Sequence, residues 1–140
     1  MLLVDTNVLV DLFGNDPQWA DWSERQLRMQ AAVHALVIDP VVYAELAAQF
    51  TAPRELDAQL ARLRIELVTP PRPALFLAGK AFVRYRRRGG TKHSVLPDFL
   101  VGAHAAVCGW PILTRDPRRY RDYFPTVQLI TPEFLPDAAP

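Results

Sequence analysis

Short apolar runs alternate with longer helical patterns along the chain, and this alternation limits the fold more than any other feature of the sequence. Five runs bounded by Asp, Thr or Pro predict buried strands at 2–4, 35–38, 65–68, 112–113 and 127–130. Amphipathic or apolar segments between them predict helices at 7–13, 17–34, 40–50, 53–63, 73–88, 97–108 and 117–123. The pattern therefore predicts an α/β fold, with three α/β/α layers around a mainly parallel sheet of four to five short strands.

Length and composition predict one intracellular domain. The chain has 140 residues, half of them hydrophobic, which is enough for a single core. Its 13 prolines stand at element boundaries, except for a loose Pro-rich tail at 132–140, so we expect one domain at 1–131. The lone Cys108 excludes an internal disulfide, and Met1 opens into an apolar run without a signal-peptide pattern. We therefore expect a cytoplasmic protein without a membrane segment.

The basic residues are mostly arginines, 14 of 16, and they cluster although the net charge is only +1. Residues 86–93 read as a basic, flexible loop, and the planar guanidinium group suits phosphate recognition. Candidate RNA-binding residues are Arg86, Arg87, Arg88, Lys92 and Arg115. The alternative is that these side chains form ordinary solvated surface, and the sequence leaves both interpretations open.

Three aspartates fall where strands end or helices begin. Asp5 ends the first strand, Asp98 opens the helix after Pro97, and Asp116 follows the strand at 112–113. All three are therefore expected near the sheet edge at which parallel α/β folds place their chemistry. Each has an alternative role as a helix N-cap, the role that we expect for Asp39 before Pro40.

Glu45 is the only charged residue in the segment PVVYAELAAQF at 40–50. A helix that is apolar nearly all round is expected to be buried, and a buried glutamate needs a partner. No basic residue is close to it in sequence, so a metal ion is one candidate partner.

If Asp5, Glu45, Asp98 and Asp116 converge, their mutual repulsion requires a cation. Two like charges about 4 Å apart cost roughly 4 kcal/mol at an effective dielectric near 20. Several such pairs would exceed the roughly 5–15 kcal/mol of stability that an ordinary domain has. Ligation by oxygen alone favours Mg²⁺ or Mn²⁺, which activates water and neutralises charge on a phosphodiester.

Four segments resemble, in order and approximate spacing, the acidic motifs of PIN domains. They are VDTNVLVDL at Val4–Leu12, YAEL at Tyr43–Leu46, LPDFLVGAHA at Leu96–Ala105 and LTRD at Leu113–Asp116. Within that superfamily the chain is similar to VapC-type toxins of toxin–antitoxin pairs. The resemblance implies a PIN-like fold, a Mg²⁺- or Mn²⁺-dependent endoribonuclease that uses a metal-activated water, a homodimer, and an antitoxin partner of VapB or similar type.

The resemblance also implies roles for individual residues. Asp5, Asp98 and Asp116 would bind the metal directly or through water, and Glu45 would bind a second metal or orient the attacking water. Three neighbours would support the site: the Thr6 and Asn7 side chains would fix the Asp5 carboxylate, and Thr114 would hold an acid or the water. For Thr6 and Asn7, a simple helix start is the alternative interpretation.

Other function classes fit less well. Haloacid-dehalogenase-type phosphatases need a second Asp two residues after the first, where this chain has Asn7. Response-regulator receivers need an Asp after a middle strand, where Val68 is followed by Thr-Pro-Pro. A non-catalytic PIN-like module that binds RNA or protein stays open as an alternative, and so does a metal-dependent phosphatase of another type.

Overall fold

The computed structural model describes residues 1–92 and 95–132. Its strands are β1 (Leu2–Val4), β2 (Leu36–Ile38), β3 (Glu66–Leu67), β4 (Ile112–Leu113) and β5 (Leu129–Ile130). Its helices are α1 (Thr6–Phe13), α2 (Ala20–Ala31), α3 (Pro40–Leu46), the 3-10 helix η1 (Ala47–Gln49), α4 (Pro53–Arg62), α5 (Arg72–Arg87), α6 (Leu96–Cys108) and α7 (Arg118–Tyr123). Each element falls on a segment for which the sequence predicts the same structure.

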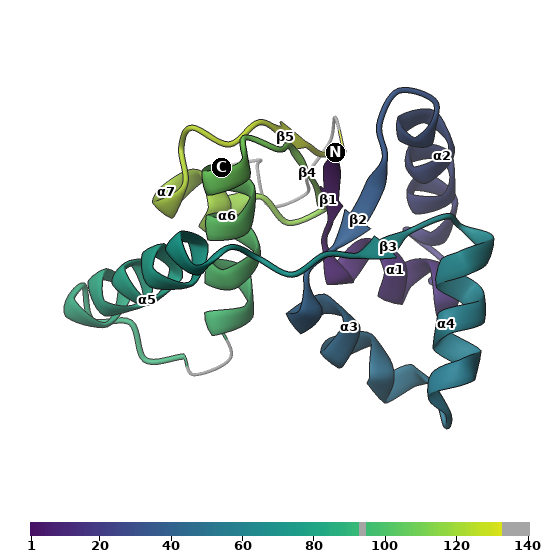
Figure 1. The fold of residues 1–140 in the computed structure, drawn as a ribbon, viewed down its shortest axis with the longest axis horizontal. Helices are drawn as coiled ribbons and strands as arrows, with labels where there is room; N and C mark the ends of the chain where they lie inside the picture. The colour runs from purple at the N-terminus through teal and green to yellow at the C-terminus, as the bar shows by residue number, and fades with distance from the viewer. Residues whose placement is uncertain (93–94, 133–140) are drawn as a thin grey trace.

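The five strands form one parallel sheet in the order β3-β2-β1-β4-β5. Figure 1 shows helices α1 to α4 on one side of this sheet and α5 to α7 on the other. The predicted three-layer α/β/α fold is therefore confirmed. The chain runs outward from β1 to β2 and β3, then returns to β4 on the other side of β1. The carboxyl ends of β1 and β4 thus meet at a topological switch point, where such sheets bind ligands.

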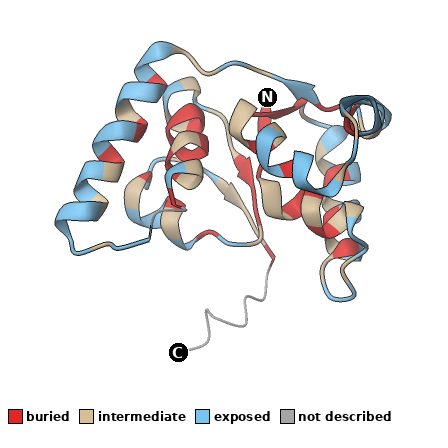
Figure 2. Cartoon of the chain, turned by 90° about the horizontal axis from the view of Figure 1, so that it is seen from below, coloured by how far each residue is buried: buried red, intermediate tan, exposed pale blue. Residues whose placement is uncertain are grey.

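The three central strands form the middle of the hydrophobic core. β1, β2 and β4 are buried throughout, which explains why their sequences are apolar without alternation. Figure 2 shows buried residues along these strands and on the inner helix faces, while the outer helix faces are exposed. In α6, Gly102 permits close packing, because a Cβ atom there would lie 2.3 Å from the Phe124 ring. The helix that carries Asp98 is thereby fixed against the segment that follows α7.

Three local predictions are wrong. The edge strands β3 and β5 are not buried as predicted: both residues of β3 are exposed and both residues of β5 are half-buried, because an edge strand has a neighbour on one side only. Arg86 and Arg87 form the last turn of α5 and Arg88 is its C-cap, so they do not lie in a flexible loop. The helix continues because no residue before Gly89, which has φ +87°, interrupts it. Glu45 is exposed instead of buried. The outward positions around it in α3 and η1 are mostly alanines, whose exposure costs little, so the apolar composition of the segment does not require burial.

Some sequence predictions concern residues outside the described part of the chain. Apart from residue 132, the expected tail at 132–140 is not described, and neither is residue 93 of the basic segment. Among the described helices, none has the length and apolar character needed to cross a bilayer.

Candidate active site

Asp5 is buried at the end of β1, and four donors hold its carboxylate. As the N-cap of α1 it accepts a hydrogen bond from the Thr6 backbone N at 2.8 Å. Its Oδ2 accepts from Thr114 Oγ1 at 2.9 Å, Tyr120 OH at 2.8 Å and Asn7 Nδ2 at 3.3 Å. Burial raises the pKa of Asp5, and the negative charge of Glu45 adds to this rise. The hydrogen bonds from Tyr120, Thr114 and the Thr6 backbone oppose it. The carboxylate is oriented firmly but costly to keep charged.

Asn7 and Thr114 connect the start of α1 with the end of β4. Asn7 Nδ2 donates to Thr114 Oγ1 at 3.1 Å, and Asn7 Oδ1 accepts from the Arg115 backbone N at 3.1 Å. Thr114 Oγ1 in turn accepts from the Asp116 backbone N at 3.1 Å. The two side chains therefore orient Asp5 and fix the backbone that carries Asp116.

Thr6 differs from its expected role. Its side chain donates to Glu45 Oε1 at 2.6 Å, and only its backbone N contacts Asp5. The reason lies in the helix start: the backbone N–H of the first helical residue faces the N-cap carboxylate, while its side chain points outward toward α3. Thr6 thereby links the exposed Glu45 to the buried Asp5 across the two helices.

Asp98, in the first turn of α6, is the acid that its neighbours affect most clearly. Its pKa is raised to about 7, first by burial and then by the charge of Asp5, with smaller contributions from Glu45 and Asp116. Arg119, with Nε 3.4 Å from Asp98 Oδ2, opposes the rise. The four predicted acids are therefore close enough to repel one another, although they come from four separate segments.

Asp116 has the opposite perturbation. Arg118 Nε donates to Asp116 Oδ1 at 3.1 Å, and its NH2 group donates to Oδ2 at 3.4 Å. This pairing lowers the pKa of Asp116. About half of the Asp116 side chain is exposed, so the pair lies at the mouth of the site.

The acids suit a divalent cation in their chemistry but do not form a ligand shell as they stand. Carboxylate oxygens are the donors that Mg²⁺ and Mn²⁺ prefer. Within residues 1–92 and 95–132, however, no three His, Cys, Asp or Glu side chains are already arranged around one ion position. Arg118 and Arg119 supply the positive charge at Asp116 and Asp98 instead. Metal binding would therefore require side chains of the site to rearrange.

Sequence reasoning missed two buried polar residues, Asp11 and Tyr120. Tyr120 is fully buried, and burial together with the charge of Asp5 raises the pKa of its hydroxyl well above 10. Asp11 is buried and forms an ion pair with Arg115, whose Nε and NH2 groups each donate a hydrogen bond to one carboxylate oxygen. The signal for Asp11 was a second acid inside the apolar segment at 2–13; no comparable signal marked Tyr120.

Asp39 has the expected capping role and a further one. Its Oδ1 accepts from the Val41 backbone N at 2.8 Å, which confirms the predicted N-cap of α3. Its Oδ2 lies 2.8 Å from Nδ1 of His104, and both side chains are buried. This contact joins the start of α3, which carries Glu45, to the middle of α6, which carries Asp98.

The predicted RNA-binding residues are divided between two places. Lys92 lines a pocket of about 270 Å³, together with Tyr85, Asp98, Asp116, Arg118, Arg119, Asp122 and Tyr123. Arg88 lies over the Tyr123 ring at 5.3 Å, while Arg86 and Arg87 are exposed on the last turn of α5. Arg115 pairs with Asp11 and lies over Trp19, so its charge is already used inside the protein.

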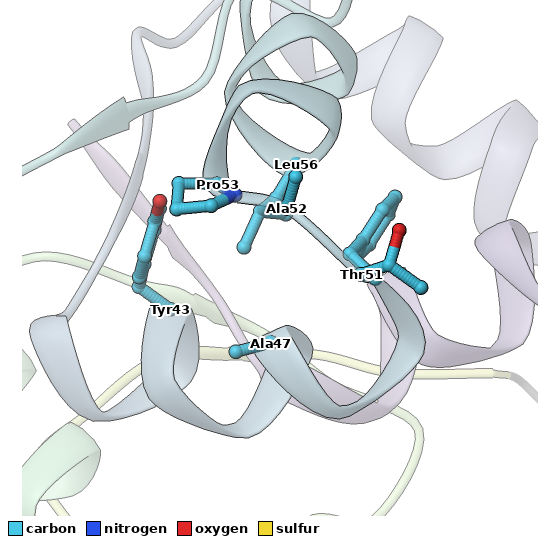
Figure 3. A pocket seen from close by; sticks show the side chains of 7 residues that line it. Tyr43, Ala47, Thr51, Ala52, Pro53 and Leu56 are labelled. Atoms are coloured by element: carbon cyan, nitrogen blue, oxygen red, sulfur yellow. The ribbon is translucent and has the colours of Figure 1, made fainter.

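A second pocket, of about 230 Å³, lies between α3 and α4 (Figure 3). It is lined by Tyr43, Ala47, Phe50, Thr51, Ala52, Pro53 and Leu56. None of the four acids lines it, and Tyr43 is its only ionisable side chain. The pocket beside Asp98 and Asp116 is therefore the better candidate for chemistry.

Comparisons with known proteins agree with this fold. The family model described as PIN domain matches residues 2–123. No curated protein matches the sequence significantly. Among solved structures, VapBC2 from Rickettsia felis bound to a promoter DNA fragment has a TM-score of 0.70 at 20% identity, covering 93% of this chain and 97% of that chain. FitAcB from Neisseria gonorrhoeae has a TM-score of 0.65 at 20% identity, covering 96% and 100%. VapBC-1 from nontypeable Haemophilus influenzae has a TM-score of 0.69 at 18% identity, covering 93% and 96%.

Proposed function

The chain belongs to the PIN-domain family, and on that premise we propose that it is a divalent-metal-dependent endoribonuclease, the toxin of a toxin–antitoxin pair. One observation carries the proposal. Asp5, Glu45, Asp98 and Asp116 come from four separate segments, yet the first, second and fourth all raise the pKa of Asp98. A fold that concentrates four carboxylates at the switch point of its sheet favours a site for a cation.

We propose that these four carboxylates hold Mg²⁺ or Mn²⁺. When bound, the ion would activate a water molecule and neutralise charge on the reacting phosphate. The chain's own residues would orient the ligands: Tyr120, Thr114 and Asn7 fix Asp5, while Thr6 fixes Glu45. Glu45 is exposed, and among the described residues its one hydrogen-bond partner is Thr6, which contacts Oε1. Its Oε2 would therefore orient the attacking water or accept its proton.

The proposed partners are an RNA substrate, a second copy of the chain and an antitoxin protein. Support for the antitoxin comes from a solved toxin–antitoxin complex from Klebsiella pneumoniae, which has a TM-score of 0.63 with this chain at 20% identity. Because the proposed substrate is RNA, we expect the protein to act in the cytoplasm. The arginines and tyrosines around the pocket beside Asp98 support an RNA partner, because guanidinium groups bind phosphates and aromatic rings stack on bases.

A cleavage assay tests the proposal. Purified protein should cleave single-stranded RNA with Mg²⁺ or Mn²⁺, and a chelator should abolish cleavage. Asp98→Asn should lose most of the activity while keeping the fold, whereas Asp21→Asn should not. Asp21 is a matched control, because it also lies in the first turn of a helix, is exposed and is remote from the site. Cleavage that survives exhaustive chelation would contradict the metal mechanism. If no metal supports cleavage, the non-catalytic binding module becomes the better interpretation.

A further inference from the structure

Two consecutive arginines at the start of α7 neutralise two different acids of the site. Arg118 binds both oxygens of Asp116, and Arg119 Nε lies 3.4 Å from Asp98 Oδ2. The Arg119 contact is an ion pair without a well-aligned hydrogen bond, since its Nε is buried and has no hydrogen-bond partner among the described residues. Charge and the Tyr85 ring, 5.3 Å away, hold the Arg119 guanidinium in place.

The same arginines line a pocket that combines positive charge with aromatic rings. Lys92 adds a third cation, and Tyr85 and Tyr123 add two partly exposed rings. Arg84 and Arg88 lie over the Tyr123 ring at 5.6 and 5.3 Å. Guanidinium forks and stacked rings next to one another are the features with which proteins bind single-stranded nucleic acid. The Asp98 and Asp116 side of the pocket would repel a phosphate unless a cation neutralised it.

A metal ion and a guanidinium group cannot both neutralise the same carboxylate fully. A divalent cation at Asp98 and Asp116 would displace Arg118 and Arg119 from them. Displacement would leave Arg119, only 25% exposed, without its counter-charge in a partly desolvated pocket. An uncompensated charge in such surroundings is costly, so the arginine would then bind an anion more tightly.

We propose that Arg118 and Arg119 are internal counter-ions of Asp116 and Asp98, and that metal binding releases them to hold RNA phosphates in the adjoining pocket. The inference rests on the proposed ribonuclease function and deepens it. The protein then binds RNA weakly while its arginines are paired with its own acids, and more tightly once the metal is bound. By linkage, metal and RNA each increase the affinity for the other.

Arg119→Gln separates the two roles of the arginine, because it removes the charge and keeps a planar polar group. The variant should bind Mn²⁺ about two- to five-fold more tightly than the parent, because a partly exposed ion pair contributes about that much. With Mn²⁺ present it should bind a labelled 2′-O-methyl oligoribonucleotide more weakly. The slope of log affinity against log salt should fall by about 0.7 for the lost phosphate contact.

Mn²⁺ binding is measured by titration in an electron paramagnetic resonance spectrometer, and oligonucleotide binding by fluorescence anisotropy, with the probe recovered intact on a gel. Arg121→Gln is the matched control: Arg121 lies in the same helix and is exposed, but does not line the pocket. It should change neither affinity to a comparable degree. Arg119→Lys keeps the charge and loses the planar fork, so it should bind Mn²⁺ like the parent and the probe more weakly. Melting temperatures verify that each variant is folded.

Opposite shifts of the two affinities in Arg119→Gln, without comparable shifts in Arg121→Gln, support the proposal. It is overturned if Arg119→Gln binds Mn²⁺ no more tightly than the parent, or if Mn²⁺ fails to tighten probe binding by the parent. If the parent still cleaves RNA with metal in that case, only the counter-ion proposal fails. If the parent binds no Mn²⁺ and cleaves no RNA, the proposed function fails with it.

Discussion

Asp98→Asn should stabilise the metal-free protein, and the gain should depend on pH. In the folded chain the pKa of Asp98 is about 7, against about 3.9 in an unfolded chain. Folded protein therefore binds more protons than unfolded protein between these two values. Its stability is fully present below about pH 4 and falls as pH rises to about 7. Asparagine cannot ionise, so the variant avoids this loss.

The magnitude follows from burial and exposure together. A rise in pKa from 3.8 to about 7 would correspond to about 4 kcal/mol for a fully buried carboxylate. The Asp98 side chain is 43% exposed, so water screens the repulsion and we expect about 1–2 kcal/mol. For a chain of this length that gain raises the melting temperature by about 3–7 °C above pH 7. Near about pH 4 the difference between variant and parent should almost vanish.

Thermal unfolding followed by circular dichroism, in chelator and across about pH 4 to pH 8, measures the difference. Asp21→Asn again serves as control, because it removes an acid from the first turn of a helix without removing repulsion between site residues. A variant that is less stable than the parent at about pH 8 would refute the reasoning and assign Asp98 a structural role. So would a gain that is the same at every pH.

Two further expectations concern the support of Asp5 and the cellular effect. Tyr120→Phe removes a buried hydroxyl that donates to Asp5 Oδ2 at 2.8 Å, so unfolding free energy should fall by about 1–2 kcal/mol in chemical denaturation. The pKa of Asp5 should rise further and Mn²⁺ should bind more weakly; an unchanged midpoint and unchanged Mn²⁺ affinity would contradict this role. Expression of the parent chain should arrest bacterial growth, while Asp98→Asn should be tolerated. Harmless expression of the parent would count against the toxin assignment.

The structure also changes what sequence reasoning implies for the other acids. Relief of repulsion alone suggests that asparagine at Asp5 or Asp116 would stabilise the metal-free protein as well. Asp5, however, accepts four hydrogen bonds, and an amide group cannot accept on both of its ends. The pKa of Asp116 is lowered by Arg118, so its charged form is already favoured in the folded chain. Among these three acids, only Asp98 combines repulsion with few hydrogen bonds.

The sequence by itself determined the layers of this fold and the edge at which the site lies. Apolar runs too short and too continuous for half-exposed strands require a parallel sheet covered on both faces, and every predicted strand is present. Asp5, Asp98 and Asp116 could be placed at the carboxyl edge because strand ends and helix starts are local features. The Asp39 cap could be predicted for the same reason.

Only the tertiary structure decided which side chains bind or neutralise those acids. Glu45 is exposed because α3 buries Val42 and Leu46 and leaves Glu45 on its outer side. The Thr6 side chain therefore binds Glu45, while the Thr6 backbone N binds Asp5. Tyr120 reaches Asp5 across 115 positions of sequence, and Arg119 reaches Asp98 from another helix. Hydrogen bonds and charge interactions act over a few ångströms in space. The order of residues along the chain does not show which distant residues come that close in the folded protein. Periodicity therefore locates elements, while the packing of α6 and α7 against the sheet selects the partners.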